Sequence, residues 1–311
     1  MRRLRFLPAF VVLATLVLAG QETPPSIVVD GVPPVPAELR ARMNQYLNMR
    51  VAGFADWHPR QRAMLILTRF GDTAQVHMVR APGAYRQQLT FFPDRVLDAK
   101  FAPATKKDYF LFSMDTGGGE FYQIYKFDRG DGSIKMLTDG KSRNEGLLFN
   151  HRGTQAAYVS QRRNGRDFDL YVMNPEDLKN EKMVAELKGQ WAPLDWSKDD
   201  SRLLLMEQIS INETYLHTFD PASGRVDLLT PKESEKVAYG AARWSGDGQG
   251  LFVVSDRGSE FQRLFYCDLA AKSFTSLTDH IPWDVEEIEL SPDGRILAFT
   301  VNADGMSELH L

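Results

Sequence analysis

Short apolar segments alternate with polar turns along most of the chain, and this pattern predicts antiparallel β-structure. The stretch "SPDGRILAFTVNADGMSELHL" at residues 291–311 contains a polar turn, an apolar run, a second turn with Gly and Asp, and an alternating segment. Short runs bounded by Gly, Pro, Asn and Asp are typical of strands joined by hairpins. We therefore expect strands of a few residues each over this part of the chain.

The same pattern occurs six times. Aligned on the bulky apolar residue before the polar turn, the six units share one column of large side chains: Trp57, Phe101, Phe149, Trp196, Trp244 and Leu290. The successive spacings are 44, 48, 47, 48 and 46 residues. A near-constant period of this length indicates a repeat architecture.

Each unit follows one plan of four short strands, and several units close on a Leu-Thr or Met-Leu-Thr segment. These segments end at Thr90, Thr138, Thr230 and Thr278. Four antiparallel strands per repeat are typical of one β-propeller blade, whereas a sandwich or barrel, the competing all-β folds, requires no sequence period. We predict an all-β propeller of about six blades near residues 50–92, 93–140, 141–188, 189–231, 236–279 and 283–311, the last incomplete.

The residues before the repeats divide into three segments. Residues 1–19 carry arginines, a 13-residue apolar run from Phe6 to Leu18 and then small residues, which is the pattern of a secretory signal peptide. An uncleaved anchor is the alternative, although the run is short for a membrane span. After cleavage we expect a secreted or periplasmic protein without membrane contact.

The rest of this region is a Pro-rich extension at 20–35 and a predicted helix at 36–49. Five prolines lie between residues 24 and 36, and these remove backbone donors and restrict φ. From residue 37 onward the apolar side chains follow helical spacing, and they are Leu39, Met43, Tyr46 and Leu47. The pattern predicts one amphipathic helix whose apolar face packs against another part of the protein.

Charge and cysteine content exclude some classes of function. The chain has 37 Lys and Arg against 41 Asp and Glu, and loss of the three arginines of the signal peptide would make the mature protein more acidic. An acidic protein is a poor ligand for nucleic acid, because that binding depends on neutralising phosphates. The one cysteine, Cys267, can form no intrachain disulfide, and its apolar surroundings predict a half-buried structural role.

No motif for catalysis or metal binding stands out. The six histidines are scattered without ligand spacing, and no serine lies in a G-x-S-x-G motif. The Gly-rich "DTGGGEF" at 115–121 falls where other repeats have a hairpin turn, so a turn is favoured over a phosphate-binding loop. We expect no catalytic residue, no metal and no cofactor in this chain.

One pair of carboxylates is a candidate for substrate binding. Glu286 and Glu287 lead into the last repeat within "WDVEEIELSPDG". Adjacent carboxylates at the start of a strand are usually solvated. If they faced a chamber, they could hold a substrate's ammonium group by charge-assisted hydrogen bonds.

Several longer strings resemble a known family. "FLFSMDTGGGEFYQIYKFD", "RRNGRDFDLYVMNP", "WAPLDWSKDDSRLL" and "SDRGSEFQRLFYCDL" are similar to the N-terminal propeller of secreted bacterial serine peptidases of the prolyl oligopeptidase family, in the dipeptidyl aminopeptidase and acylaminoacyl-peptidase branch. The resemblance covers residues 36–311. The "SPDGR…LAF" element is less specific, because TolB-like periplasmic propellers share it.

The resemblance implies a gating function. In that family a propeller of seven or eight blades precedes an α/β-hydrolase domain that carries a Ser, Asp and His triad, and the ring admits short peptides. A Glu pair binds the substrate's amino terminus in the dipeptidyl peptidases, which would place Glu286 and Glu287 in that role, although "WDVEEIE" lacks the family's Tyr. A stand-alone TolB-like propeller that binds other proteins is the alternative.

The chain departs from the family pattern by supplying five blades, most of a sixth and no triad. On this basis we expect an N-terminal fragment whose partner, the hydrolase domain, is absent. Such a chain should hydrolyse nothing by itself and should aggregate or dimerise through its open edge.

Overall fold

The computed structural model describes residues 28–103, 107–232 and 235–311. The predicted signal peptide at 1–19 lies outside these residues. The chain separates into two units, Met1–Met49 and Arg50–Leu311.

The first unit contains the predicted helix as α1 (Ala37–Leu47). Pro36 precedes it with φ −56°, and the Pro36 carbonyl accepts a hydrogen bond from the Arg40 N–H at 3.0 Å. The side chains of α1 are exposed, and the packing of its apolar face stays a prediction. Within residues 28–311, apart from the two short gaps, no helix has the length and apolarity needed to cross a membrane.

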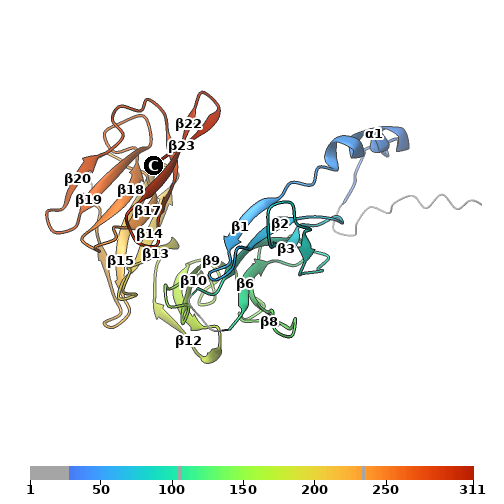
Figure 1. The fold of residues 1–311 in the computed structure, drawn as a ribbon, viewed down its shortest axis with the longest axis horizontal. Helices are drawn as coiled ribbons and strands as arrows, with labels where there is room; N and C mark the ends of the chain where they lie inside the picture. The colour runs from blue at the N-terminus through green and yellow to red at the C-terminus, as the bar shows by residue number, and fades with distance from the viewer. Residues whose placement is uncertain (1–27, 104–106, 233–234) are drawn as a thin grey trace, which may run out of the picture. The chain divides into compact units, whose positions relative to one another are not determined.

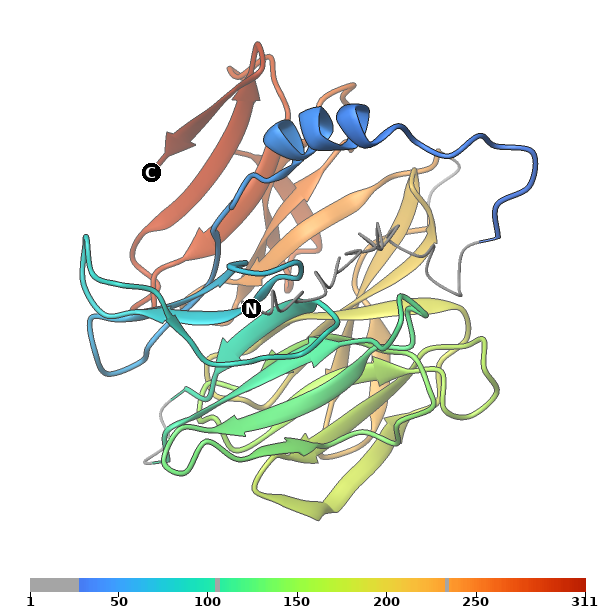
Figure 2. The same ribbon diagram turned by 90° about the vertical axis from the view of Figure 1, so that its right-hand side faces the viewer.

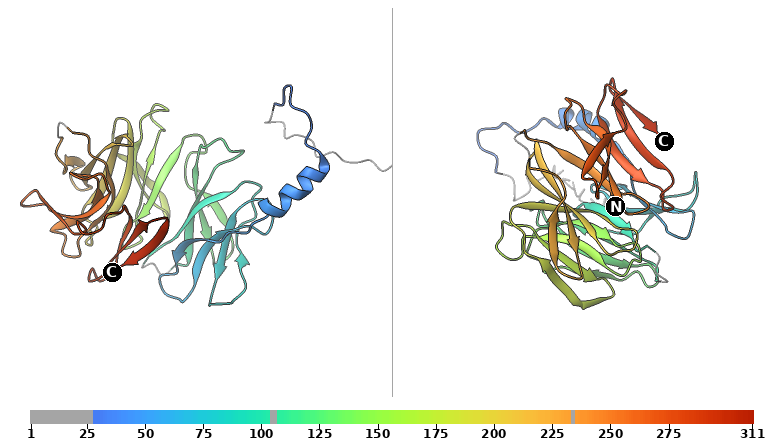
Figure 3. Two further views of the ribbon diagram at one scale, coloured as in Figure 1. Left: turned by 90° about the horizontal axis from the view of Figure 1, so that it is seen from above. Right: turned by 90° about the vertical axis from the view of Figure 1, so that its left-hand side faces the viewer.

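The second unit is a β-propeller of six antiparallel blades, which confirms the predicted fold (Figure 1). Five blades have four strands and the sixth has three, and in every blade the strands pair in chain order. Each sheet has the twist expected of short antiparallel strands (Figures 2 and 3).

The bounds of the strands are as follows. Blades 1 to 3 contain β1 (Gly53–Trp57), β2 (Met64–Thr68), β3 (Gln75–Val79), β4 (Gln87–Gln88), β5 (Val96–Phe101), β6 (Tyr109–Met114), β7 (Gln123–Asp128), β8 (Ile134–Met136), β9 (Asn144–Phe149), β10 (Ala156–Ser160), β11 (Asp169–Asn174) and β12 (Asp177–Ala185). Blades 4 to 6 contain β13 (Gln190–Trp196), β14 (Leu203–Ser210), β15 (Glu213–Asp220), β16 (Arg225–Leu228), β17 (Tyr239–Trp244), β18 (Gly250–Ser255), β19 (Arg263–Asp268), β20 (Ser273–Ser276), β21 (Val285–Leu290), β22 (Leu297–Ala303) and β23 (Met306–His310).

The first strand of every blade ends at the residue of the aligned apolar column, from Trp57 in β1 to Leu290 in β21. Each of these strands also carries a register shift against the second strand. A bulge of this kind adds a residue to one strand and increases its local twist. The repeat in the sequence therefore corresponds to a repeated backbone irregularity as well as to a repeated side chain.

Apolar runs in the second strands supply both faces of a blade. In β6, Phe110 and Phe112 belong to the core shared with blade 1, whereas Tyr109 and Leu111 belong to the core shared with blade 3. Successive strand residues point to opposite faces, so a strand buried on both sides is apolar throughout. Five such cores join consecutive blades, and the described residues include none between blades 6 and 1.

The recurrent threonines close the blades. The hydroxyl of Thr230 accepts a hydrogen bond from the Leu216 N–H at 3.0 Å, and Thr90, Thr138 and Thr278 bind their own third strands in the same way. In blade 3 the carboxylate of Asp169 replaces the threonine hydroxyl as the acceptor, and it accepts a hydrogen bond from the Leu187 N–H at 2.9 Å. Each contact satisfies a buried N–H beyond the end of the regular ladder.

Two faces of the propeller follow from this topology. We call the face where the first strand of each blade begins the start face, and the face where that strand turns into the second strand the turn face. Loops between second and third strands lie on the start face, and loops between third and fourth strands lie on the turn face. Both faces carry cavities formed by loops of several blades.

Candidate functional site

Glu286 and Glu287 lie at the bulge of β21 near the start face. Val285 pairs with Val301 and Ile288 with Phe299, so the two glutamates together oppose one residue of β22. Both side chains are exposed, and Glu286 accepts a hydrogen bond from the Asn302 amide at 3.3 Å. The pair is therefore accessible to a ligand at the start of an innermost strand.

Glu286 lines a cavity of about 440 Å³ on the start face. The other lining groups include Gln208, Ile211 and Asp284, from the β14–β15 hairpin and the segment before β21. Glu287 does not line it. The cavity combines carboxylates and amides with several apolar side chains, among them Met206, Ile211 and Val254, which suits the amino-terminal end of a peptide better than an anion.

Exposed apolar side chains also gather on the start face. Phe91, Phe121 and Ile211 lie in its loops, and Ile211 is 83% exposed. Phe70, Ile209, Leu277, Trp283 and Met306 are further exposed apolar residues at this end of their strands. On the turn face, Tyr85 and Ile296 are exposed in loops, and Trp57, Ile134 and Leu311 are exposed at the ends of strands. An apolar surface of this kind marks an interaction site more often than a free surface.

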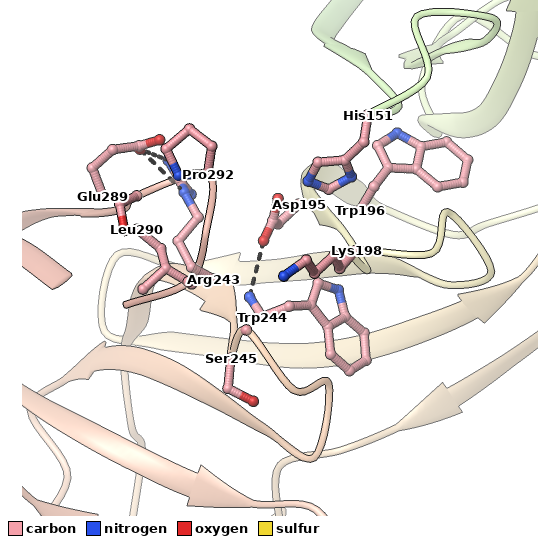
Figure 4. A pocket seen from close by; sticks show the side chains of 13 residues that line it. His151, Asp195, Trp196, Lys198, Arg243, Trp244, Ser245, Glu289, Leu290 and Pro292 are labelled. Atoms are coloured by element: carbon pink, nitrogen blue, oxygen red, sulfur yellow. Dashed lines mark hydrogen bonds and ion pairs between the residues drawn. The ribbon is translucent and has the colours of Figure 1, made fainter. Parts of the chain in front are cut away.

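A second, polar cavity of about 110 Å³ opens on the turn face (Figure 4). Its lining residues come from the ends of the first strands of blades 3 to 6 and from the turns that follow them. The lining residues are His151, Asp195, Trp196, Lys198, Arg243, Trp244, Ser245, Gly246, Glu289, Leu290, Ser291, Pro292 and Gly294. We call it the turn-face pocket. Gly246 and Gly294 allow two of these turns to touch, because a Cβ on Gly246 would lie 2.9 Å from the Gly294 Cα.

Asp195 connects two blades at this pocket. Its carboxylate accepts a hydrogen bond from the Trp244 N–H at 2.9 Å, as Asp56 accepts one from the Phe101 N–H at 2.8 Å (Figure 4). Burial raises the pKa of Asp195 to about 6, although the Trp244 N–H and the charge of Arg243 both act to lower it. The side chain therefore changes charge just below neutral pH.

The remaining charged groups of the pocket differ in their pairing. Arg243 is within 3.2 Å of the Glu289 carboxylate, so these two charges largely cancel. His151 Nδ1 lies 3.1 Å from Asp200, which also accepts the His151 backbone N–H. Lys198 is exposed, and its charge helps to lower the pKa of Asp293, although no hydrogen bond or ion pair of its ammonium group is found among the described residues.

The sequence carried a signal for this pocket that a motif search does not detect. The residue immediately before the apolar column is charged in five of the six repeats: Asp56, Lys100, Asp195, Arg243 and Glu289. In a β-strand that residue points to the opposite face from the column. The apolar column was predicted from the sequence, whereas a role for these charged neighbours was not.

The other residues that the sequence singled out lie in the core or in a turn. Cys267 is buried in the core between blades 4 and 5, more deeply than predicted, and burial raises the pKa of its thiol to about 11. The Gly-rich segment at 115–121 forms the hairpin between β6 and β7. No group of three or more potential metal ligands occurs in residues 28–103, 107–232 and 235–311.

These features define a six-bladed β-propeller, and comparison with known proteins connects it with peptidases. No protein-family profile matches the chain. In sequence it is 25% identical over 209 residues to the uncharacterized peptidase YuxL of Bacillus subtilis, a match that covers 67% of this chain and 29% of YuxL. The chain thus spans less than a third of that relative.

Solved structures show the same fold. A puromycin-hydrolyzing peptidase of Mycobacterium tuberculosis matches 84% of this chain and 43% of its own, with a TM-score of 0.66 and 16% identity. A prolyl endopeptidase matches 83% of this chain and 41% of its own, with a TM-score of 0.64 and 13% identity. TolB of Acinetobacter baumannii matches 86% and 63%, with a TM-score of 0.56 and 17% identity.

Proposed function

We propose that this chain is the substrate-gating propeller of an exported serine peptidase that cleaves short peptides. The sequence similarity to YuxL and the propeller fold shared with two peptidases support the peptidase connection. In this proposal the chain selects substrates, and a hydrolase domain outside these residues performs the cleavage.

The distribution of side chains on the start face carries the proposal. Exposed apolar residues such as Phe91, Phe121 and Ile211 provide a surface for a second domain. Glu286 and Glu287 lie at the same end of the strands, next to the 440 Å³ cavity. A peptide held between the two domains would meet these carboxylates with its ammonium group.

The test uses the complete product of the reading frame that contains this chain. We expect it to hydrolyse chromogenic peptide anilides and to be labelled by a fluorophosphonate, whereas residues 20–311 alone do neither. Absence of peptide hydrolysis by the complete product would contradict the proposal.

The Glu pair is tested separately by Glu286→Gln and Glu287→Gln in the complete product. Loss of one charge-assisted hydrogen bond should raise KM about tenfold for substrates with a free amino terminus. KM for acetylated substrates should not change. Glu308→Gln, an exposed glutamate on β23, is the control and should affect neither substrate class. Equal effects on free and acetylated substrates would exclude amino-terminal recognition.

The fold match to TolB supports a second candidate, a periplasmic propeller that acts as a protein-binding scaffold. TolB is matched over 63% of its own length, a larger share than in either peptidase. A scaffold would bind a folded protein through the start face without any hydrolysis. Retention of that binding in a complete product that fluorophosphonates do not label would favour this candidate.

A further inference from the structure

The turn-face pocket contains hydrogen-bond donors that lack acceptors. The indole Nε1 atoms of Trp196 and Trp244 are both buried, and neither has a partner among the described residues. The two residues are 1% and 3% exposed and both line the pocket. A buried N–H without an acceptor is destabilising, so two at one cavity indicate that something else accepts these hydrogen bonds.

Lys198 adds a positive charge to these donors. It forms no ion pair within the part of the chain that the structure describes, although its charge acts on the nearby Asp293 carboxylate. In Figure 4 the nitrogen edge of the Trp244 indole faces Lys198, and that of Trp196 faces His151. Arg243 contributes little net charge, because Glu289 is its partner at 3.2 Å. The donors without a described acceptor are therefore two neutral N–H groups and one ammonium group, and these suit a ligand that only accepts hydrogen bonds, although the Asp195 carboxylate shares the pocket with them.

We propose that the turn-face pocket binds a carboxylate group, held by the Lys198 ammonium and by the indole N–H groups of Trp196 and Trp244. Charge-assisted hydrogen bonds to an oxyanion are stronger than neutral ones, so Lys198 supplies most of the affinity. A cavity of about 110 Å³ admits a carboxylate with a short chain and excludes a large ligand. This site is independent of the proposed peptidase function, because Glu286 and Glu287 lie at the other end of the strands.

Asp195 makes the binding depend on pH. Its carboxylate faces the same pocket as Arg243, His151, Glu289 and Lys198, and when ionised it repels a bound anion. Protonation removes that charge as the pH falls through about 6, the raised pKa of Asp195. Carboxylate affinity should therefore increase on acidification, and Asp195→Asn should reduce this dependence while keeping an acceptor for the Trp244 N–H.

The test follows the indole N–H resonances of the ¹⁵N-labelled chain by NMR while acetate is added at millimolar concentrations. The expected result is a saturable shift of the Trp196 and Trp244 signals, assigned with Trp196→Phe and Trp244→Phe. The Trp191 signal should stay in place, because its indole already donates to the Lys188 carbonyl at 2.9 Å. Chloride at equal ionic strength is the reference. If neither signal shifts saturably, the pocket holds only water and the proposal is wrong.

Two further arms identify the source of the carboxylate and the role of Lys198. Trialanine with a free carboxyl group is compared with its C-terminal amide: a peptide that binds more tightly than acetate indicates a peptide C-terminus, and a weaker one indicates a small free acid. Binding of the amide as tightly as the acid would overturn the proposal. Lys198→Met should lower the affinity at least about tenfold. Lys141→Met, an exposed lysine on the start face, should not.

Discussion

Trp57 and Trp196 occupy the same column of the repeat, yet their environments are opposite. Trp57 is 61% exposed and contacts Phe54 with a ring separation of 5.5 Å, whereas Trp196 is 1% exposed within the core between blades 3 and 4. The column residues of blades 2 to 5 belong to the core shared with the preceding blade. No described blade precedes blade 1, so the same residue type at the same strand end stays exposed.

This difference shows that the position of a residue within the repeat does not determine whether its side chain is buried. Burial depends on whether a neighbouring blade packs against it. Each blade contacts its neighbours alone, so stability is approximately a sum over interfaces.

The largest effect should come from Trp196→Ala. Removal of a fully buried Trp leaves a cavity and should lower the free energy of unfolding by about 3–5 kcal/mol. Trp57→Ala should change it by less than about 1 kcal/mol, because little packing is lost. Urea unfolding followed by circular dichroism measures both. Similar losses for the two variants would show that Trp57 is packed in solution, against a surface that this structure does not contain.

Gly146→Ala should cause the next largest loss in the free energy of unfolding. Gly146 has φ +70°, and an added Cβ would lie 2.7 Å from the Pro193 Cδ of blade 4. Left-handed strain and overpacking together should cost about 2–4 kcal/mol. Gly224→Ala is the matched control, with φ +73° and no atom within 4 Å of its Cβ, and it should cost only about 1 kcal/mol. Equal losses of stability in the two variants would mean that Pro193 can move away from the added Cβ without a loss of packing energy.

Thr230→Val removes a closing hydroxyl while keeping the side-chain shape. The buried Leu216 N–H would lose its acceptor, which should cost about 1–3 kcal/mol. Amide exchange at Leu216 should become faster as well. Thr275→Val, an exposed residue on the outer strand β20, should be close to neutral. An unchanged exchange rate at Leu216 would show that the hydroxyl does not satisfy this N–H in solution.

The smallest effect should be the opposite pH dependence of two nearby aspartates. The pKa of Asp195 is raised to about 6, so the folded state binds its proton more tightly than the unfolded state, and the contribution to stability is present at low pH and lost as the pH rises through 6. The pKa of Asp247 is lowered, first by the Ser245 hydroxyl, so its contribution is present near neutral pH and lost on acidification. Asp195→Asn and Asp247→Asn should therefore change the slope of stability against pH in opposite directions. Denaturant unfolding across about pH 4 to 8 measures the slopes, and equal slopes would contradict the assigned environments.

The sequence alone predicted the repeat, the all-β propeller and the residue at which each first strand ends. These features depend on local rules, because alternation of apolar residues and turn chemistry act over a few neighbouring positions. The position of Glu286 and Glu287 at the start of the last blade was predicted for the same reason. Their bulge was not, since a register shift depends on pairing with β22.

The tertiary structure alone decided which equivalent residues are buried and which groups meet in one pocket. His151, Asp195, Arg243 and Glu289 come from four repeats, and each is separated from the next by more than forty residues of chain. Their proximity depends on how blades pack side by side, and so does the desolvation that raises the pKa of Asp195. The sequence of one repeat is therefore sufficient to predict a blade. The electrostatics of the turn-face pocket arise only when four consecutive blades pack against one another.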